Sequence, residues 1–368
     1  MLFQLSCGRC KKEVPIMSRQ LRCPSCGGVF FIRAEELPKG NFGAVVDHGS
    51  RGVWRFRKVL PFATDPVSLG EGGTPILEKH EDGAQLLLKL EYCAPTGSFK
   101  DRGASVSLTR VKAIGAKGIV EDSTGNAGIA ASAYAAKAGM RARVYVPSDA
   151  PAVKKSLIKA CGAEVVETLN RGEASRRAQG ELKDGEVYIG HTMDPFYVEG
   201  MKTIAYEVFE DKCVPDLVIV PVASGTILIG IYKGFLELQE MGLLADLPSI
   251  YGVQGEGCAP IYEVLHGKLD GVRTSYLADG LRIADPPRKR EIVDVIKKTG
   301  GDIFTVADSE IASSVKELYR TGIIAEPTSA TVLAAFRKNE KDLKGKILMP
   351  ITGSGMKTAD KLAQILQL

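Results

Sequence analysis

The stretch CAPTGSFKDRGAS, residues 93–105, places a lysine where a turn containing proline and glycine enters a helix pattern. Ser98 is a residue type favoured at a helix N-cap, so Lys100 would lie in the first helical turn, where the helix dipole disfavours positive charge. One interpretation is that Lys100 has a lowered pKa and acts as a nucleophile or forms a Schiff base. The alternative is a solvated lysine beside Asp101.

A second candidate site is the turn at the start of EDSTGNAGIAASAYAAKAGM, residues 121–140. Ser123, Thr124 and Asn126 form a small polar turn that opens an alanine-rich helix pattern, and the free N–H groups at such a helix start can hold an anion. The Asn126 side chain can also hydrogen-bond a ligand oxygen. An ordinary Ser/Thr N-cap explains the same residues without a ligand.

In two later turns an apolar strand pattern runs into small residues and then into a helix pattern. In VIVPVASGTILIGIYKGF, residues 218–235, the small residues would let backbone N–H groups approach a phosphate. The P-loop and dinucleotide signatures are both missing, so a monophosphate group fits better. In ILMPITGSGMK, residues 347–357, the Thr352 hydroxyl could meet a ring nitrogen or another phosphate. Plain strand-to-helix turns are the alternative for both stretches.

Taken together, the four stretches describe one kind of site. It has a lysine, a phosphate cradle, a turn with an asparagine and a turn with Thr, Ser and Gly. A cofactor that carries both an aldehyde and a phosphate uses this set, because the lysine forms an imine with the aldehyde and the cradle holds the phosphate. The remaining polar groups would hydrogen-bond to O3′ and N1 of the cofactor ring.

The N-terminal segment, residues 1–35, contains two CxxC pairs separated by twelve residues. Four thiolates on two tight turns can converge on a tetrahedral metal site, where Zn²⁺ is the usual ion and iron the less common one. Four protein ligands close such a site, so its expected role is structural. A segment this short and poor in apolar residues needs a bound metal ion to fold. The ligands would be Cys7, Cys10, Cys23 and Cys26.

The length of 368 residues predicts two or more domains. Hydrophobic residues make up 45% of the chain and charged residues 25%, and no apolar run reaches membrane-spanning length. The first residues do not resemble a signal peptide, so a cytoplasmic location is expected. The net charge of +4 arises in residues 1–39, which contain seven Lys/Arg and three Asp/Glu. The rest of the chain is neutral, which argues against nucleic acid as its main partner.

From about residue 84, short apolar runs alternate with helix patterns, which predicts an α/β fold with parallel sheets covered by helices. Ligands of such folds bind beyond the carboxyl ends of the strands, where the polar turns lie. The expected strands are 85–90, 118–121, 142–147, 163–168, 186–190, 216–222, 249–254, 302–306 and 346–351. Besides the helix that follows Ser98, the expected helices are 126–138, 151–161, 199–209, 226–239, 308–320 and 328–337.

The combined motifs resemble threonine synthase, a member of the fold-type II pyridoxal phosphate enzymes. The similar stretches include TGSFKDRGA, DSTGNAGIAASAYAAKAG, GIIAEPTSA and PITGSGMK, and the resemblance extends over essentially the whole chain. GVWRFRKVLP and VSLGEGGTPI, residues 52–61 and 67–76, are similar to the front of that enzyme, and the CxxC segment to that of some prokaryotic members. GSFKDRG and TGN are shared with dehydratases and cysteine synthases, whereas EPTSA together with TGSGMK is more selective.

The resemblance implies a fold with two open parallel-sheet domains of the tryptophan synthase β-like class, plus the small zinc ribbon. The implied domains are the ribbon at 1–35, a large cofactor-binding domain at 36–90 and 196–368, and a small inserted domain at 91–195. Pyridoxal phosphate would bind between the two larger domains. A cytoplasmic homodimer is also expected.

The resemblance also assigns roles to residues. Lys100 would form the Schiff base and act as the catalytic base, Asn126 would face the ring O3′, and Thr352 would pair with N1. The chain departs from the usual glycine-rich cradle by having Ala223 and Ser224 in it. The cofactor phosphate would be bound by the backbone of Ser224, Gly225, Thr226 and Ile227. The substrate carboxylate or phosphate would be bound by Ser98, Ser123 and Thr124, with Lys154 or Lys155 assisting.

The implied reaction converts O-phosphohomoserine and water to threonine and phosphate by β,γ-elimination and replacement. Related enzymes on the same scaffold are the alternatives: a threonine or serine dehydratase, or a cysteate synthase that uses phosphoserine. A protein of another class, a zinc-ribbon nucleic-acid-binding protein with a degenerate body, would account for the basic N-terminal segment. The joint presence of Lys100, Asn126 and Thr352 argues against that class.

Overall fold

The computed structural model describes residues 2–81, 83–123, 125–269 and 277–367. These residues divide into two compact units. Unit 1 consists of Met1–Gly73, Ala94–Thr203 and Glu240–Leu243. Unit 2 consists of Thr74–Cys93, Ile204–Gln239 and Leu244–Leu368. Helix α5 (Pro195–Glu210) begins in unit 1 and ends in unit 2.

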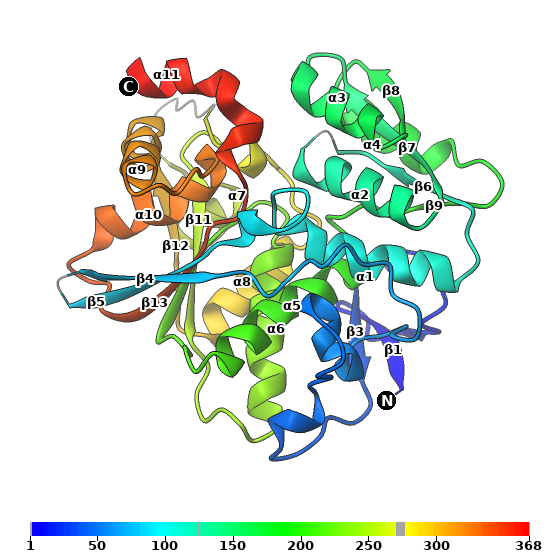
Figure 1. The fold of residues 1–368 in the computed structure, drawn as a ribbon, viewed down its shortest axis with the longest axis horizontal. Coiled ribbons are helices and arrows are strands. Elements are labelled where there is room, and N and C mark those ends of the chain that lie inside the picture. Colours follow the sequence, from blue (N-terminus) through cyan, green and yellow to red (C-terminus); the bar gives the residue numbers. More distant parts are fainter. Residues whose placement is uncertain (1, 82, 124, 270–276, 368) are drawn as a thin grey trace. The chain divides into compact units, whose positions relative to one another are not determined.

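Unit 1 contains a four-stranded parallel sheet in the order β8-β7-β6-β9. Helices α1 and α2 pack against each other, and α2 and α4 contact β7 (Figure 1). The strands are β6 (Gly118–Glu121), β7 (Arg141–Pro147), β8 (Glu164–Thr168) and β9 (Glu186–Tyr188). The helices are α1 (Lys100–Ala113), α2 (Asn126–Lys137), α3 (Ala152–Ala160) and α4 (Arg171–Gly180).

The N-terminal segment of unit 1 is a separate antiparallel sheet in the order β2-β1-β3. Its buried residues share one hydrophobic cluster with Trp54, with Val106 of α1 and with Phe196 of α5. The strands are β1 (Phe3–Cys7), β2 (Glu13–Val14) and β3 (Phe30–Ala34), and short 3-10 segments follow at Phe42–Ala44 and Gly52–Val59.

Unit 2 contains a six-stranded sheet in the order β12-β11-β10-β13-β5-β4. The strands are β4 (Ile76–Glu81), β5 (Ala84–Lys89), β10 (Leu217–Pro221), β11 (Ser249–Gly255), β12 (Ile303–Val306) and β13 (Gly345–Pro350). The helices are α6 (Thr226–Glu240), α7 (Pro260–His266), α8 (Lys289–Lys298), α9 (Asp308–Arg320), α10 (Pro327–Asn339) and α11 (Leu362–Gln367). Short 3-10 segments occupy Glu91–Cys93, Asp279–Leu281 and Gly355–Lys361.

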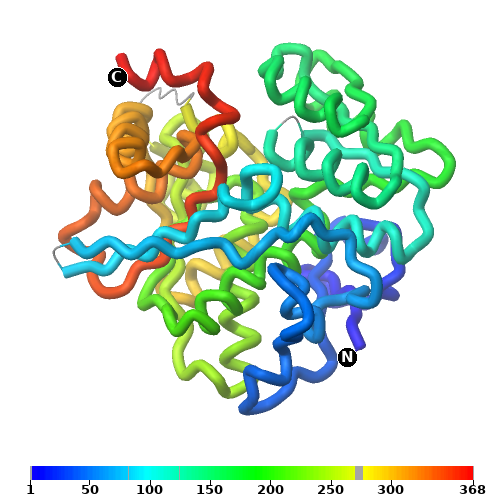
Figure 2. Tube along the Cα trace, viewed as in Figure 1, coloured from blue at the N-terminus to red at the C-terminus, as the bar shows by residue number. Residues whose placement is uncertain are grey.

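The edge of the unit 2 sheet is an antiparallel hairpin, whereas the other neighbouring strands pair in parallel. Figure 2 follows the hairpin as two adjacent segments in cyan, formed by β4 and β5. β4 has the sequence ILEKHE, in which no residue is fully buried, as expected for an edge strand. The parallel fold class is therefore confirmed, with one antiparallel edge strand that was not expected.

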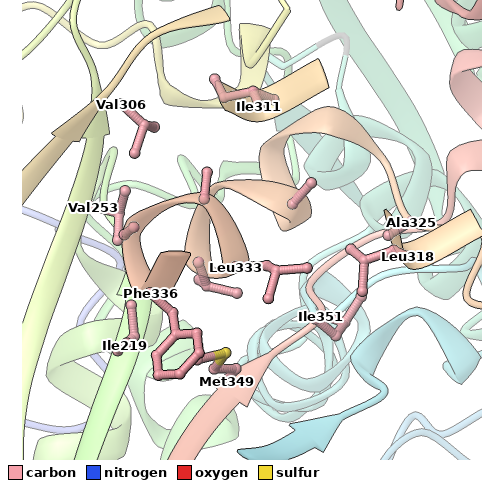
Figure 3. Close-up of a cluster of buried hydrophobic side chains, with 14 of the residues drawn as sticks. Ile219, Val253, Val306, Ile311, Leu318, Ala325, Leu333, Phe336, Met349 and Ile351 are labelled. Carbon is pink, nitrogen blue, oxygen red and sulfur yellow. The ribbon is translucent and has the colours of Figure 1, made fainter. Parts of the chain in front are cut away.

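The core of unit 2 forms where α10 packs on the sheet and α9 packs on α10. β10 reads LVIVP and all five of its residues are buried, as expected for an interior parallel strand covered on both faces. Leu333 and Phe336 of α10 lie in one cluster with Ile219 of β10 and Met349 of β13 (Figure 3). This packing fixes the carboxyl ends of β10 and β13, which lead into two of the polar turns.

Each expected strand overlaps an observed one, but four of the described α-helices were not expected: α4, α7, α8 and α11. α4 carries a recognisable start signal, because the Asn170 side chain accepts a hydrogen bond of 2.9 Å from the Glu173 N–H. α5 begins at Pro195 and not at residue 199, since proline suits the first helical position. Among the described helices, none has both the length and the apolar character that crossing a membrane requires.

A charge network connects the edge hairpin to the helices of unit 2. Arg337 of α10 donates to Glu81 of β4 over 2.9 Å and also to Glu317 of α9, and Lys79 lies 2.8 Å from Glu81. Hydrogen bonds from Arg337 and Lys79 lower the pKa of Glu81 from 4.5 to about 2. The ionised carboxylate therefore stabilises the fold above pH 4.5, and this stabilisation is lost as the pH falls toward 2.

We expect Glu81→Gln to lower the midpoint of thermal unfolding at pH 7 by about 2–4 °C, the equivalent of about 1 kcal/mol for a partly exposed network. The difference from the unmodified chain should shrink at pH 3.5, because Glu81 then becomes partly protonated in the unfolded chain. Circular dichroism melts at both pH values measure this. Glu78→Gln, at an exposed position of the same strand, is the control. A difference that persists unchanged at pH 3.5 would contradict the assignment.

Candidate functional site

Lys100 is the first residue of α1 and is half-buried, with its Nζ 4.6 Å from the centroid of the Phe99 ring. The expectation that Ser98 caps this helix is wrong. Phe99 occupies the N-cap position without a side-chain hydrogen bond, and the Ser98 hydroxyl is buried with no partner among the described residues. A residue within the helix holds this turn in place instead.

That residue is Asp101, which is buried in the first turn of α1. Its carboxylate accepts a hydrogen bond of 2.6 Å from the Thr96 N–H and a second one from the Thr96 hydroxyl. A carboxylate in this turn is also favoured by the helix dipole. Asp101 is therefore engaged with the preceding turn, and Ser98 is left with an unused hydroxyl beside Lys100.

Close packing against α5 fixes the position of α1. A Cβ atom added at Gly103 would lie only 2.1 Å from Cδ1 of Tyr197, so the contact requires glycine. The neighbouring Arg102 guanidinium donates to the Thr203 hydroxyl of the same helix over 2.9 Å. These two contacts with α5 help to set the place of Lys100 at the start of α1.

The turn before α2 holds the next predicted residues. The Ser123 hydroxyl accepts a hydrogen bond of 3.3 Å from the Gly125 N–H, and Gly125 is the N-cap of α2. Asn126 is the first residue of α2 and is partly exposed. Thr124, also predicted for this site, lies outside the described residues. Because α2 packs against α1, unit 1 brings two helix starts from the predicted set into one region.

The two predicted lysines of α3 differ in their surroundings. Lys154 is buried, with an exposed fraction of 7%. The Lys155 ammonium donates to the Ser148 carbonyl over 3.0 Å and to Glu167 over 3.1 Å. α3 packs against α2, so both residues belong to the same side of the small sheet. Lys155 is committed to neighbours on the surface, whereas Lys154 is held within the unit.

In unit 2 the carboxyl ends of two neighbouring strands, β10 and β13, lead to the other predicted residues. After β10, Ser224 precedes Gly225, and α6 begins at Thr226 and continues through Ile227. Gly225 has φ +80°, and a Cβ there would lie 2.4 Å from Cγ1 of Ile292, so only glycine fits. The first N–H groups of a helix have no acceptor within the helix, which leaves them available to an anion.

Thr352 follows β13 and is buried. Its hydroxyl lies 2.9 Å from that of Ser329, at the start of α10, and the Ser329 hydroxyl in turn accepts from the Gly353 N–H over 2.8 Å. The role of Ser329 in holding Thr352 was not predicted. Its signal was present in the stretch GIIAEPTSA, which supported the resemblance without any role being given to this serine.

A cluster in unit 1 was not predicted at all. Glu121 ends β6, Asp122 follows it, and the Nδ1 of His191 lies 3.0 Å from Oε1 of Glu121. Burial raises the pKa of Glu121 to about 7 and also raises that of Asp122. Burial, with the positive charge of Lys100, lowers the pKa of His191. The cluster and Lys100 therefore influence each other electrostatically.

The four N-terminal cysteines come together as predicted. Their sulfur atoms all lie within 4.8 Å of one another, with Cys7 and Cys26 at 3.4 Å and Cys10 and Cys23 at 3.6 Å. Ligands of a tetrahedral zinc ion with Zn–S bonds of about 2.3 Å are separated by about 3.8 Å. Despite burial, hydrogen bonds from the N–H groups of Ser25 and Cys26 lower the pKa of Cys23 to about 6, which favours a thiolate.

Comparison with known proteins connects these observations to a family. A family model described as "Pyridoxal-phosphate dependent enzyme" matches residues 67–353. The chain is 33% identical to the threonine synthase of Methanocaldococcus jannaschii over 377 residues, covering 96% of this chain and 93% of the relative. It is 33% identical to the threonine synthase of Methanosarcina acetivorans over 360 residues, covering 92% and 87%.

Solved structures show the same fold. Maize serine racemase superposes with a TM-score of 0.66 at 24% identity, covering 80% of this chain and 92% of that one. A fungal L-serine ammonia-lyase from Rhizomucor miehei gives 0.69 at 20% identity, covering 82% and 99%. The family match spans both the α1 lysine and the turns after β10 and β13. The chain therefore belongs to the fold-type II family of pyridoxal-phosphate-dependent enzymes.

Proposed function

We propose that this enzyme is a threonine synthase, which converts O-phosphohomoserine and water to threonine and inorganic phosphate with Lys100 as its catalytic residue. The observation that carries the proposal is the presence of two sets of anion-binding groups. One is the start of α6 in unit 2, and the other is the region of unit 1 around Ser98 and the starts of α1 and α2. The names of the relatives, threonine synthase, support threonine as the product.

The described residues fit pyridoxal phosphate. Gly225, with φ +80°, lets the chain turn directly from β10 into α6, whose first N–H groups suit a phosphate, and this fits backbone binding by Ser224 to Ile227. The buried hydroxyl of Thr352, oriented by Ser329, suits a ring nitrogen, and Asn126 suits the ring O3′. When bound, the cofactor supplies a conjugated system that accepts the electron pair released at the substrate α carbon. A threonine at N1 does not favour protonation of that nitrogen as an aspartate would.

The proton transfers fall to Lys100. As a free amine, Lys100 could accept the α proton of the substrate and later return it. A proton leaves the β carbon, and breakage of the γ carbon–oxygen bond releases phosphate with the bonding electrons. The γ carbon then takes up a proton and becomes the methyl group of threonine. Water adds its hydroxyl group at the β carbon, and the remaining water proton leaves with the phosphate. Lys100 is half-buried, which limits the access of solvent to its amine.

The substrate phosphate needs several donors and at least one cation, because it carries nearly two negative charges at neutral pH. We assign Ser98 and Ser123 as donors, with Thr124 as a further candidate from outside the described residues. The unused hydroxyl of Ser98 supports this assignment. Of the two lysines, Lys154 is favoured as the cation, because its side chain is buried within unit 1 on a helix that packs against α2.

The Lys100 assignment can be checked by absorbance. Holoenzyme should show the visible band of a lysine–cofactor imine, and Lys100→Ala should lose that band and at least a thousandfold of turnover, of the order expected when a nucleophile and base is removed. Lys112→Ala, at the other end of α1, is the control and should keep both. A visible imine band that persists in Lys100→Ala would show that another lysine binds the cofactor.

Substrate choice is tested by comparing phosphate release from O-phosphohomoserine with ammonia release from threonine and serine. We expect phosphate release to dominate and inorganic phosphate to compete with the substrate. Lys154→Met should raise KM for O-phosphohomoserine by roughly tenfold or more, since it removes a charge-assisted contact, while Lys155→Met should leave it nearly unchanged. Ready deamination of threonine with no phosphate release would instead identify a dehydratase on the same scaffold.

We further propose that the four-cysteine ribbon binds a structural Zn²⁺ that supports α1. Cys7 and Cys23 are almost fully buried, at 1% and 2% exposed, in the cluster that includes Val106 of α1. On the same face of α1, the Arg110 guanidinium lies 4.9 Å from the Phe196 ring and donates to the Ser18 carbonyl. The ribbon therefore contacts the helix that begins with Lys100, on a face away from its first turn.

Loss of the ribbon metal should weaken more of unit 1 than residues 1–35. We expect about one Zn²⁺ per chain, and Cys7→Ser should lose it, lower the thermal midpoint and raise hydrogen exchange in α1. Cys213→Ser in unit 2 is the matched control. Metal loss with unchanged exchange in α1 would mean that the ribbon folds independently of this helix.

A further inference from the structure

The cluster formed by Glu121, Asp122 and His191 has the geometry of a metal site. Each residue offers a ligand atom, and these atoms all lie within 4.8 Å of one another. The Nδ1 of His191 and Oε1 of Glu121 are 3.0 Å apart. In an octahedral site with bonds of about 2.1 Å, neighbouring ligand atoms are separated by about 3.0 Å and opposite ones by about 4.2 Å. Small side-chain adjustments would therefore be enough for the three ligand atoms to coordinate one ion.

Two polar atoms near this cluster lack a partner. Glu121 is fully buried, and while its Oε1 accepts from the Asp122 N–H over 3.0 Å, its Oε2 has no hydrogen bond among the described residues. The ring of Tyr197 lies 6.1 Å from that of His191, and the buried Tyr197 hydroxyl is likewise unpartnered in the described part of the chain. Buried oxygen atoms without partners are costly, which indicates that a further polar group or ion belongs here.

We propose that Glu121, Asp122 and His191 bind a divalent first-row metal ion such as Mn²⁺. Two carboxylates and one imidazole form a mixed oxygen and nitrogen donor set, which suits such ions. The four thiolates of the ribbon suit Mn²⁺ less well. The carboxylates bring two negative charges to a buried position, and a divalent ion balances them. The Tyr188 hydroxyl, which donates to Asp122 over 3.1 Å, would orient this ligand in the way that metal-bound carboxylates are commonly held.

Three protein ligands leave coordination positions open to water or to a ligand oxygen. The site follows the carboxyl end of β6, directly before the turn that contains Ser123. Other charged groups act on the cluster: Lys100 on Glu121 and His191, and Arg171 and Asp194 on His191. Without an ion, Lys100 would be the main counter-charge of Glu121, and this is the arrangement that the experiment must distinguish.

The test uses cofactor-loaded full-length enzyme whose ribbon carries zinc, dialysed free of other metals. Mn²⁺ is added at pH 8 and free Mn²⁺ is followed by electron paramagnetic resonance. The unmodified enzyme should bind about one Mn²⁺ per chain. His191→Ala and Asp122→Asn should each weaken binding by roughly tenfold or more. His266→Ala should not, because His266 forms an exposed pair with Asp302, 2.6 Å away, and the described residues offer no third ligand there.

Asp122→Asn keeps the size of the side chain and its contact with Tyr188, so it serves if His191→Ala does not fold, as judged by circular dichroism. The proposal is overturned if the unmodified enzyme binds no Mn²⁺, in which case the cluster is only a counter-charge for Lys100. It is also overturned if Mn²⁺ binds equally well to folded Asp122→Asn, because the ion then lies elsewhere. Neither outcome depends on which substrate the enzyme uses.

Discussion

The burial of a polar helix is the constraint on which the rest of unit 1 depends. α1 is buried along nearly its whole length, although many of its side chains are polar. Its buried polar residues are Asp101, Arg102, Ser105, Ser107, Thr109 and Arg110. An unpartnered polar group inside a protein costs about 1–3 kcal/mol, so the neighbouring elements must supply partners. Trp54 donates to the Ser105 hydroxyl over 2.8 Å, and the Val67 N–H donates to Thr109 over 2.8 Å.

These partners come from segments far apart in the sequence, and together they determine where Lys100 lies. Arg102 is bonded to Thr203, Asp101 to Thr96, and the ribbon covers the far end of the helix near Arg110. The buried polar atoms that have no partner among the described residues include the Ser98 hydroxyl and one oxygen of Glu121, whose carboxylate is influenced by Lys100. The buried polar groups that have hydrogen-bond partners position the helix. Those without a partner among the described residues lie where we propose that ligands bind.

Much of this organisation could be predicted from the sequence, because it depends on local patterns. The strand runs, the paired cysteines and the polar turns after strands are all readable over ten residues or fewer. The helix that begins near Lys100 was also predicted, but the burial of its polar side chains was not, since partners such as Trp54 and Thr203 are distant in the chain. Ser98 was wrongly expected to cap α1 because Asp101, two residues inside the helix, holds the turn instead.

The pairing of Glu121 with His191 lies further beyond local patterns, since 70 residues separate them and only the parallel pairing of β6 with β9 brings them together. The edge strand β4 was missed for a different reason. It is too exposed to give an apolar run, so its pairing with β5 had no strong signal. Local sequence therefore predicted the turns, and the tertiary contacts decided which side chains in them are free to bind.

The central claim, that the cofactor is bound through Lys100, is tested most directly by chemical trapping. The cofactor-loaded enzyme is reduced with borohydride, digested, and the modified peptide identified by mass spectrometry. The account predicts a single phosphopyridoxyl group on the peptide that contains Lys100. A modification on another lysine, such as Lys154 or Lys89, or no modification of a properly folded and cofactor-saturated enzyme, would contradict it.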